Sequence, residues 1–542
     1  MSRVRRFLPA FFLLLIALPA YSGTQEATAE PAAEMPPRGR LLLVLPFENH
    51  TGQPNLDWIG DGAADMFNRR LDAAGFLTID RDDRLYALDR LGLPVDFHPS
   101  RATTIRIAQL LDADSVIIGS YTLTGDQLTT TARILDLHKL VLSSPVEQNS
   151  NLNNLLDTLN ALAWKVARTL DPTYSVAEQT FLAADGPLHP GAFEDYIRGM
   201  TAEAPADRIP RLKEAVRLNP GFAPAKLALG KAYFANQEYD YAAAAFGQMP
   251  TDAPNALEAD FDRGLSLFYT AHYMLAEDAF AFVATELPLA EVLNNEGVAA
   301  SRRGRDGSAL FQRAIAADPR DEDYHFNLAL SLRKKKDFAG ATREIEAALK
   351  LRPSDGDAQT VAKSLKDPQP SSGTAAPASS AGDDSLPLER IKRNYNETEF
   401  RQAAFEMEQL QTVRLAALPP GERAEKLVKD GDQFLNRGLI LEAEREYQAA
   451  LKANPTSAAA HAGLAQVREH SLDQQAARAE AQQSLRLAAN VPAYLVLARI
   501  DLKSNQLPAA ATEVSAALRM DPGNAGAQDI KKALEAKGQQ VP

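Results

Sequence analysis

Few side chains in this sequence have the types and spacing that catalysis or metal binding requires. The 542 residues include no cysteine, which removes disulfides, thiolate metal sites and cysteine nucleophiles. The eight histidines stand singly, and no two have the spacing of a pair of metal ligands. The HExxH, Walker A, kinase glycine-loop and GxSxG motifs are absent as well. The sequence therefore predicts a protein that is not an enzyme and that needs neither a metal nor a cofactor.

One glycine pair comes closest to a nucleotide-binding motif. Gly60 and Gly62 lie at the start of a predicted helix, where backbone amides can cradle a phosphate. The pair lies about a dozen residues after the preceding strand, and Asp65 stands where a dinucleotide site has its third glycine. Since an acid there would repel phosphate, we favour a tight turn packed beside Trp58.

A second cluster alternates acids with arginines after the short strand predicted at 76–80. It would form an acid–base centre only if partners from elsewhere in the fold converged on it. A solvated turn with a helix cap is the interpretation that we favour. The cluster consists of Asp80, Arg81, Asp82, Asp83 and Arg84.

Composition indicates several domains and disfavours a nucleic-acid partner. The chain is 45% hydrophobic and 24% charged, which at this length provides apolar material for several cores. Its formal net charge is −13. Because binding to duplexes draws most of its affinity from Lys and Arg on phosphates, we expect protein or peptide ligands and no nucleic acid.

The first 22 residues have the layout of a secretory signal peptide. Arg3, Arg5 and Arg6 precede an apolar run at 7–18, and Ala20 and Ser22 are small residues suited to cleavage. The run makes roughly 18 Å of helix, too short for a bilayer core of about 30 Å. We expect cleavage after Ala20 or Ser22, a disordered spacer at 23–38, and location in the periplasm or cell envelope, peripheral to the membrane at most. An uncleaved anchor is the alternative.

Residues 39–172 predict an α+β domain. The apolar run at 41–45 ends at Pro46 and suits a strand covered on both faces. A helix is expected at 55–75, then a short strand, two weaker helices, a three-stranded meander at 115–149 and an amphipathic closing helix at 151–170. The expected order is β-α-β-α-α-β-β-β-α.

Beyond residue 187, strand patterns give way to a repeated helical unit. A proline closes each unit, as at 288, 319 and 353, and the mean step is about 34 residues. Small residues such as Gly264 and Gly431 recur where two helices would pack closely, and Phe280 and Tyr447 fill the next groove. In period and residue type these units resemble tetratricopeptide repeats. The resemblance implies an all-α superhelix in two arrays, 187–365 and 421–542, and a chain that is mostly α overall.

The residues between the two arrays fall into two stretches of different composition. Residues 366–385 are mostly Pro, Ser, Gly and Ala, which predicts a flexible linker that leaves the arrays free to move. Residues 386–420 have helical composition without the repeat signature. We expect them to form a helical cap on the second array.

Motifs of the first domain follow one another in a recognisable order. A strand ending in PFEN precedes a glycine turn, a W-x-G-x-G helix start, an ADSVIIGS strand and an ARILD strand. The residues concerned are Pro46, Phe47, Glu48, Asn49, Gly52, Trp58, Gly60, Gly62, Ala113, Asp114, Gly119, Ser120, Arg133 and Asp136. This pattern resembles the amino-terminal domain of TolB and of the related envelope proteins FlgO and CsgG. The resemblance implies an assembly or interaction module of the envelope without a catalytic centre.

Repeat superhelices bind extended peptides along a concave face built from the first helix of each pair. Counted from the glycine landmark, the groove of the first array is expected to contain Lys231, Phe234, Phe268, Tyr269, Asn294, Arg302, Arg333 and Lys334. The equivalents in the second array are Asp432, Asn436, Gln466, Arg499 and Lys503. The first set mixes basic and aromatic groups and predicts a peptide that carries carboxylates and an apolar anchor. Alternatively, these are solvated positions on a spacer.

These features predict an exported, non-enzymatic scaffold of the bacterial envelope that recruits protein partners through its repeat grooves. Two alternatives stay open. One is a CsgG-like oligomeric secretion or assembly component. The other is an enzyme with an unrecognised site between the first domain and the first array.

Overall fold

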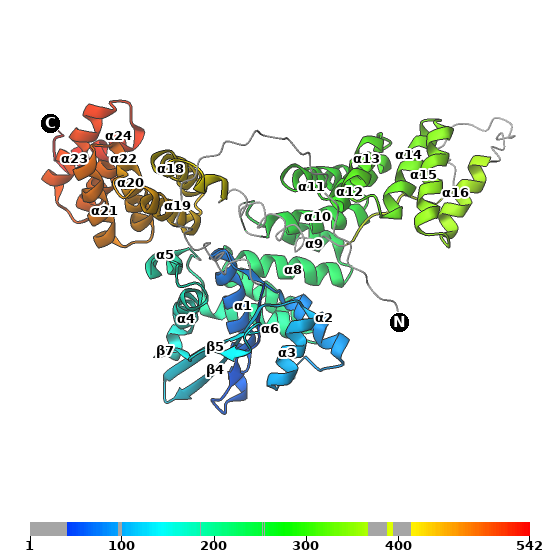
Figure 1. Cartoon of the computed structure of the whole chain (residues 1–542), viewed down its shortest axis with the longest axis horizontal. Helices are drawn as coiled ribbons and strands as arrows, with labels where there is room; N and C mark the ends of the chain where they lie inside the picture. The colour runs from blue at the N-terminus through cyan, green and yellow to red at the C-terminus, as the bar shows by residue number, and fades with distance from the viewer. Residues whose placement is uncertain are drawn as a thin grey trace, which may run out of the picture.

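The computed structural model describes residues 41–541 except 96–99, 185, 252, 254, 367–386 and 394–412. The expected signal peptide, spacer and almost all of the expected linker lie outside the described residues. The described part consists of one α/β module and two helical arrays, which extend to opposite sides above the module (Figure 1). The expected fold class, an α+β domain followed by helical repeats, is confirmed.

The module is built on one mixed sheet. Its strands are β1 (Leu41–Val44), β2 (Glu48–Asn49), β3 (Leu77–Thr78), β4 (Ser115–Thr124), β5 (Gln127–Asp136), β6 (Val141–Leu142) and β7 (Val146–Asn151). The order is β3-β1-β4-β5-β6, with β2 paired to β4 and β7 to β5. β1 runs parallel to β3 and β4, whereas β5 is antiparallel to β4. The third strand of the expected meander is split into β6 and β7 around Pro145, which has no amide hydrogen to donate.

Helices cover both faces of this sheet. α1 (Trp58–Ala73) and α4 (Leu155–Leu170) pack on one face, and α2 (Arg81–Leu91) and α3 (Arg101–Leu110) pack on the other. Leu42 and Val44 point into the first core and Leu43 and Leu45 into the second, as the alternation of a strand requires. Burial on both sides explains why β1 is continuously apolar.

Paired antiparallel helices make up both arrays. The first array contains α6 (Pro190–Thr201), α7 (Pro205–Leu218), α8 (Ala223–Ala235), α9 (Tyr239–Phe246), α10 (Ala256–Tyr269), α11 (Tyr273–Glu286), α12 (Ala290–Arg302), α13 (Ser308–Ala317), α14 (Glu322–Lys334), α15 (Phe338–Leu351) and α16 (Gly356–Lys366). The second array contains α18 (Pro420–Asn436), α19 (Ile440–Ala453), α20 (Ala458–His470), α21 (Gln474–Leu487), α22 (Val491–Lys503), α23 (Leu507–Met520) and α24 (Ala525–Ala536). Among the described residues, no helix is both long and apolar enough to cross a membrane.

Both arrays are anchored on the α/β module. α6 packs against α1, where the Tyr196 hydroxyl donates to Asp65 at 2.8 Å. The second array contacts a short helix, α5 (Glu178–Ala183), through α19 and α20, and Leu441 of α19 joins the core of the module. Figure 1 shows α5 between α4 and the second array. The expectation that the arrays move freely is therefore wrong for this structure, because each of them shares packed contacts with the module.

The expected cap at 386–420 is also corrected in part. Residues 387–393 are not helical and lie against the first array, not the second. Residues 394–412 lie outside the described range. Residues 413–416 are helical, and Leu415 packs against the core of the second array ahead of α18, so this end of the expected cap agrees with the structure.

Candidate functional site

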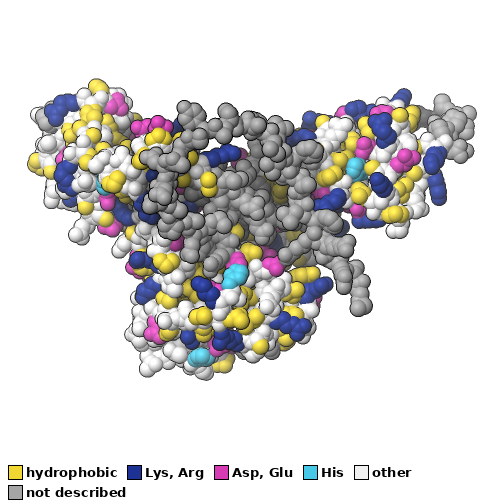
Figure 2. All heavy atoms as spheres, in the orientation of Figure 1, with side chains coloured by type: hydrophobic (Ala, Val, Ile, Leu, Met, Phe, Trp, Pro, Cys, Tyr) yellow, Lys and Arg dark blue, Asp and Glu magenta, His cyan; other side chains and the backbone are white. Residues whose placement is uncertain are grey.

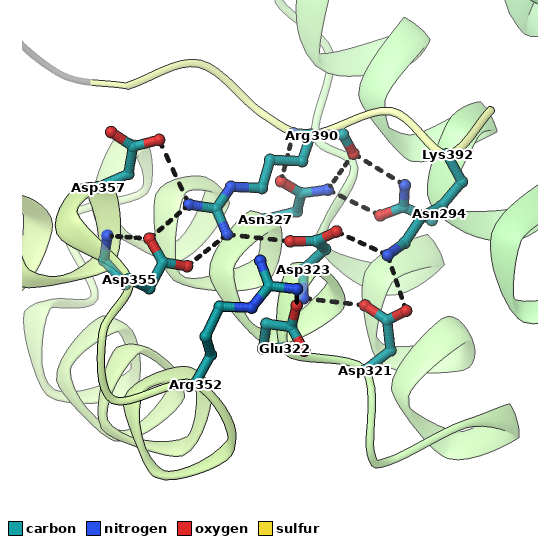
Figure 3. Close-up of polar contacts among 11 residues, drawn as sticks. Asn294, Asp321, Glu322, Asp323, Asn327, Arg352, Asp355, Asp357, Arg390 and Lys392 are labelled. Carbon is teal, nitrogen blue, oxygen red and sulfur yellow. Dashed lines mark hydrogen bonds and ion pairs between the residues drawn. The ribbon is translucent and has the colours of Figure 1, made fainter. Parts of the chain in front are cut away.

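The inner face of the first array holds residues 387–393, the segment Pro-Leu-Glu-Arg-Ile-Lys-Arg, which we call the groove segment. It crosses α12 and α14, the first helices of two successive repeats, and contacts the start of α16 (Figure 3). Its last residue, Arg393, reaches Tyr269 of α10, the first helix of the preceding repeat. Its side chains alternate in direction. Arg390 and Lys392 point to one set of partners, and Glu389 and Ile391 point to another. This alternation is typical of an extended peptide.

Buried asparagines hold the backbone of the groove segment. Asn327 donates to the carbonyl of Arg390 at 2.8 Å and accepts from its amide at 2.7 Å. Asn295 makes the same pair of bonds to Lys392, both at 2.7 Å. Asn294 donates to the Arg390 carbonyl at 3.0 Å and accepts from Asn327 at 2.7 Å. Since the bonds from the asparagines to the segment reach only its main-chain atoms, they fix the position of an extended chain whatever its sequence.

Arg390 lies in an acidic pocket between α14 and α16. Its guanidinium donates to both carboxylate oxygens of Asp355 at 2.6 and 2.8 Å, and to Asp323 at 2.9 Å. It also lies 3.8 Å from the centre of the Phe326 ring. The hydrogen bonds from Arg390 lower the pKa of Asp355 to about 2. Burial lowers the pKa of Arg390, but the bonds to Asp355 and Asp323 outweigh this and raise it above the ordinary value.

Lys392 neutralises a cluster of carboxylates at the start of α14. Its ammonium lies 2.7 Å from Asp321 and 2.6 Å from Asp323, over the ring of Tyr324. Asp321, Glu322 and Asp323 lie close enough together to share a cation. Figure 3 shows the cations that face them, which are Arg390, Lys392 and Arg352. In this structure basic side chains of the chain itself fill that role.

Glu389 occupies the opposite, basic side of the groove. Its carboxylate accepts from Ser301 and from Lys334, both at 2.5 Å, and lies 3.6 Å from Arg302. Burial opposes its charge, but the bonds from Lys334 and Ser301 outweigh burial and lower the pKa of Glu389 below the ordinary value. A buried carboxylate is tolerated there because charged donors surround it.

The remaining side chains of the groove segment make apolar and ring contacts or face solvent. Ile391 packs against the buried cluster that includes Val298, Phe311 and Leu328. Arg393 lies with its guanidinium 5.6 Å from the Tyr269 ring centre. Leu388 is 66% exposed and so contributes little to docking.

Five of the eight residues expected in the groove surround this segment. Asn294, Arg302 and Lys334 make the polar contacts described above, Tyr269 contacts Arg393, and Phe268 packs on the same buried cluster as Ile391.

The other three expected residues lie elsewhere. Lys231 pairs with Glu258 and lines a cavity between the module and the array, because α8 lies along the module and turns this position towards it (Figure 1). Phe234 makes an edge-to-face contact with Tyr239 and a tilted contact with Tyr269, and Arg333 lies half-buried in the last turn of α14. Placing Lys231 in the groove was therefore wrong.

Sequence reasoning missed most of the residues that hold the backbone and the charged side chains of the segment. They are Asn295, Asn327, Ser301, Asp321, Asp323, Phe326 and Asp355. The adjacent asparagines 294 and 295, with Asn327 one repeat later, were the available signal. Uncharged polar residues that recur on buried helix positions need partners, and a peptide backbone supplies both a donor and an acceptor.

Two cavities are lined by residues of the α/β module. They lie where the sequence left nucleotide binding and an unrecognised enzyme site as alternatives. The larger, of about 470 Å³, lies between β1, β2 and the starts of α1 and α3. A Cβ on Gly60 would lie 2.5 Å from the carbonyl oxygen of Phe47, so this glycine allows close backbone packing. The smaller cavity, of about 300 Å³, lies between the module and the first array. Of the acid–arginine cluster, Asp80 caps α2 by accepting from the Asp83 amide at 2.7 Å, as expected. Arg84, however, is buried and pairs with Asp61 at 3.3 Å, so the cluster is not wholly solvated.

The repeats match a known family. The tetratricopeptide repeat model matches residues 299–358, in the first array, and 429–492, in the second. These stretches are tetratricopeptide repeats. No curated protein matches the chain.

Similar solved structures cover parts of the chain. MamA from Desulfovibrio magneticus RS-1 is 22% identical, with 31% of this chain and 99% of that chain covered and a TM-score of 0.29. YrrB, described as a tetratricopeptide repeat protein with an unusual peptide-binding site, is 16% identical over 33% and 92%, with a TM-score of 0.29. The LpoB C-terminal domain from Escherichia coli is 20% identical over 22% and 87%, with a TM-score of 0.20. At these scores no function transfers, and the resemblance of the module to TolB, FlgO and CsgG stays a prediction.

Proposed function

We propose that the protein is a non-enzymatic scaffold that holds a protein partner by an extended peptide in the groove of its first array. The observation that carries this proposal is the pair of backbone clamps at Asn295 and Asn327. Each clamp satisfies the donor and the acceptor of one residue, and the clamped residues are two positions apart. Such an arrangement recognises main chain in extended form, as peptide-binding grooves do.

Charge supports a protein rather than a nucleic-acid partner. The net charge is −13, and on the face seen in Figure 2 the Lys and Arg side chains are scattered among acidic and apolar ones. A nucleic-acid surface would need cations gathered along a phosphate backbone.

We also propose export to the cell envelope, which rests on the basic, apolar and small residues at the start of the sequence. The measurement is amino-terminal sequencing of protein purified from fractionated cells. Envelope material that starts near Tyr21 or Gly23 is expected. Cytosolic protein that keeps Met1 would contradict export.

The groove is tested as the partner site with a variant in which docking of the groove segment is weakened. Arg390→Ala combined with Ile391→Ala, which we call the opened variant, removes two side chains that dock the segment and leaves their pockets in the array intact. Immobilised opened variant is expected to capture proteins from an envelope extract. Adding Asn295→Ala and Asn327→Ala should abolish that capture, whereas adding Asn236→Ala, at an exposed turn of the same array, should not. Equal capture with and without the two asparagines would refute the groove as the partner site.

A further inference from the structure

We propose that the groove segment is an internal ligand that closes the first array in cis, and that the partner is an extended peptide which displaces it. The partner's matching residues are an acid, an arginine, an aliphatic residue and a lysine in succession. This inference rests on the proposed scaffold function and names its ligand class and its control.

The groove segment is bound as a ligand is bound. Four consecutive side chains each have a fitted partner set: Glu389 with Ser301 and Lys334, Arg390 with Asp355, Ile391 with the apolar cluster, and Lys392 with Asp321 and Asp323. Two of these four residues are also clamped at both backbone groups. A connection that merely passed over the array would need none of these contacts.

A second peptide can exchange with the groove segment. Docking of the segment relies on hydrogen bonds, ion pairs and one aliphatic side chain, and the neighbouring Leu388 faces solvent. A second peptide with the same alternation can replace each bond by an equivalent one. Displacement therefore keeps the asparagines and carboxylates of the groove bonded to a peptide, whereas simple departure of the segment exchanges those bonds for bonds to water.

The contacts of Arg390 set the specificity of the groove at the position that this residue occupies. Arg390 binds both oxygens of Asp355 and stacks on Phe326 with its planar guanidinium. A lysine can form neither the two-point bond nor the flat stack. The groove should therefore prefer Arg there, even though the other basic position holds Lys392.

A covalent tether makes the internal ligand a strong competitor. Both ends of the segment belong to the chain that carries the groove, which gives a local concentration on the order of millimolar. A free peptide that binds the empty groove in the micromolar range must then bind the parent chain at least about tenfold more weakly.

The experiment measures binding of a fluorescein-labelled peptide, PLERIKR with blocked ends, to the full chain by anisotropy. We expect at least about tenfold tighter binding to the opened variant than to the parent. Leu388→Ala is the matched control on the same segment and should bind the peptide as weakly as the parent does. The peptide PLEKIKR should bind the opened variant less tightly than PLERIKR does.

Equal affinity of the parent and the opened variant for PLERIKR would overturn closure in cis. No binding to an opened variant that melts at the same temperature as the parent would overturn the ligand class. The scaffold function would then still be judged by capture that depends on Asn295 and Asn327, so the two failures are distinguishable.

A second measurement needs no variant. Excess unlabelled PLERIKR added to the parent should speed amide hydrogen exchange at residues 388–393, since Arg390 and Lys392 lose their asparagine acceptors. Unchanged exchange at saturating peptide would overturn displacement. Light scattering should show a monomer at all concentrations tested. A dimer whose groove segment loses protection on dilution would show that the segment occupies the groove of a second copy, and this would contradict the proposal.

Discussion

At the scale of single residues, a carboxamide is suited to hold a peptide because it offers one donor and one acceptor side by side. Asn295 and Asn327 use both towards the same residue of the groove segment. Both are fully buried beneath the docked segment, so its departure exchanges these four backbone bonds for bonds to water. Any extended chain that enters the groove can form the same four bonds again.

Docking of the groove segment should weaken in acid. Glu389 and Asp355 have pKa values below their ordinary 4.5 and 3.8, and that of Asp355 falls to about 2. Carboxyls with a lowered pKa contribute stability that is complete above the ordinary value and is lost as the pH falls through the lowered one. We therefore expect constant docking from pH 7 to 5.5 and progressive release from about pH 4.5 towards 2.5.

The measurement uses a fluorophore on Leu388→Cys, which is the sole cysteine of that variant because the natural sequence has none. Its anisotropy reports whether the segment is held or free. Far-ultraviolet circular dichroism must show that the helices persist at each pH. The additional change Glu389→Gln should weaken docking at neutral pH and reduce the loss in acid. Anisotropy that rises on acidification would contradict the assignment.

Some groove residues could be found by sequence and others could not. Arg302 and Lys334 could be predicted by counting positions on the first helix of each repeat. The count shows which side chains face the groove, even when the peptide in the groove is unknown. Asp321 and Asp323 lie at the start of a helix, where acids commonly act as caps, as Asp321 does for the Asp323 amide at 3.0 Å. Their second role towards Lys392 depends on a segment about 70 residues later, a contact that no local pattern contains.

At the scale of elements, several helix pairs are joined by close packing of a glycine against an aromatic ring. A Cβ added at Gly264 would lie 2.7 Å from the ring of Phe280, and one at Gly431 would lie 2.7 Å from that of Tyr447. Both rings are fully buried. This is why small and aromatic residues at fixed spacing predicted the repeats correctly.

Gly264→Ala should therefore destabilise the first array. The added methyl group overlaps a buried ring that has no room to move, and such overpacking costs about 1–3 kcal/mol. Thermal unfolding followed by circular dichroism measures the effect. Gly356→Ala at the start of α16 is the matched control, because a Cβ there meets nothing within 4 Å. Equal melting temperatures for the two variants would refute the packing argument.

Secondary structure was mispredicted where tertiary contacts outweigh local preference. Leu388, Glu389, Arg390 and Lys392 all favour helices, so a helical cap was a reasonable expectation. The groove instead offers two backbone clamps and three charged pockets that only an extended chain can reach together. These partners lie in another part of the sequence, and so composition did not reveal them.

At the scale of the whole molecule, the α/β module acts as the base on which both arrays are mounted. The second array is attached through Glu444, which is fully buried and accepts from Arg468 at 2.7 Å and from the Ala177 amide at 2.9 Å. Arg468 also donates to Thr180 of α5 at 2.8 Å. Burial raises the pKa of Glu444, and Arg468 partly offsets that effect. One ion pair thus connects two repeats with the module.

Arg468→Ala should loosen the second array from the module. The change leaves the carboxylate of Glu444 buried without its cation, and breaking a buried pair in this way costs about 3–5 kcal/mol. Because the arrays extend to opposite sides of the module (Figure 1), loss of this contact should increase the radius of gyration measured by small-angle X-ray scattering.

Arg486→Ala, on the exposed face of α21, is the matched control and should leave the scattering unchanged. The additional change Glu444→Gln removes the stranded charge and should restore part of the compactness. If Arg468→Ala scatters like the parent and melts at the same temperature, the ion pair does not hold the array in place and the apolar contact of Leu441 with the module's core carries the attachment.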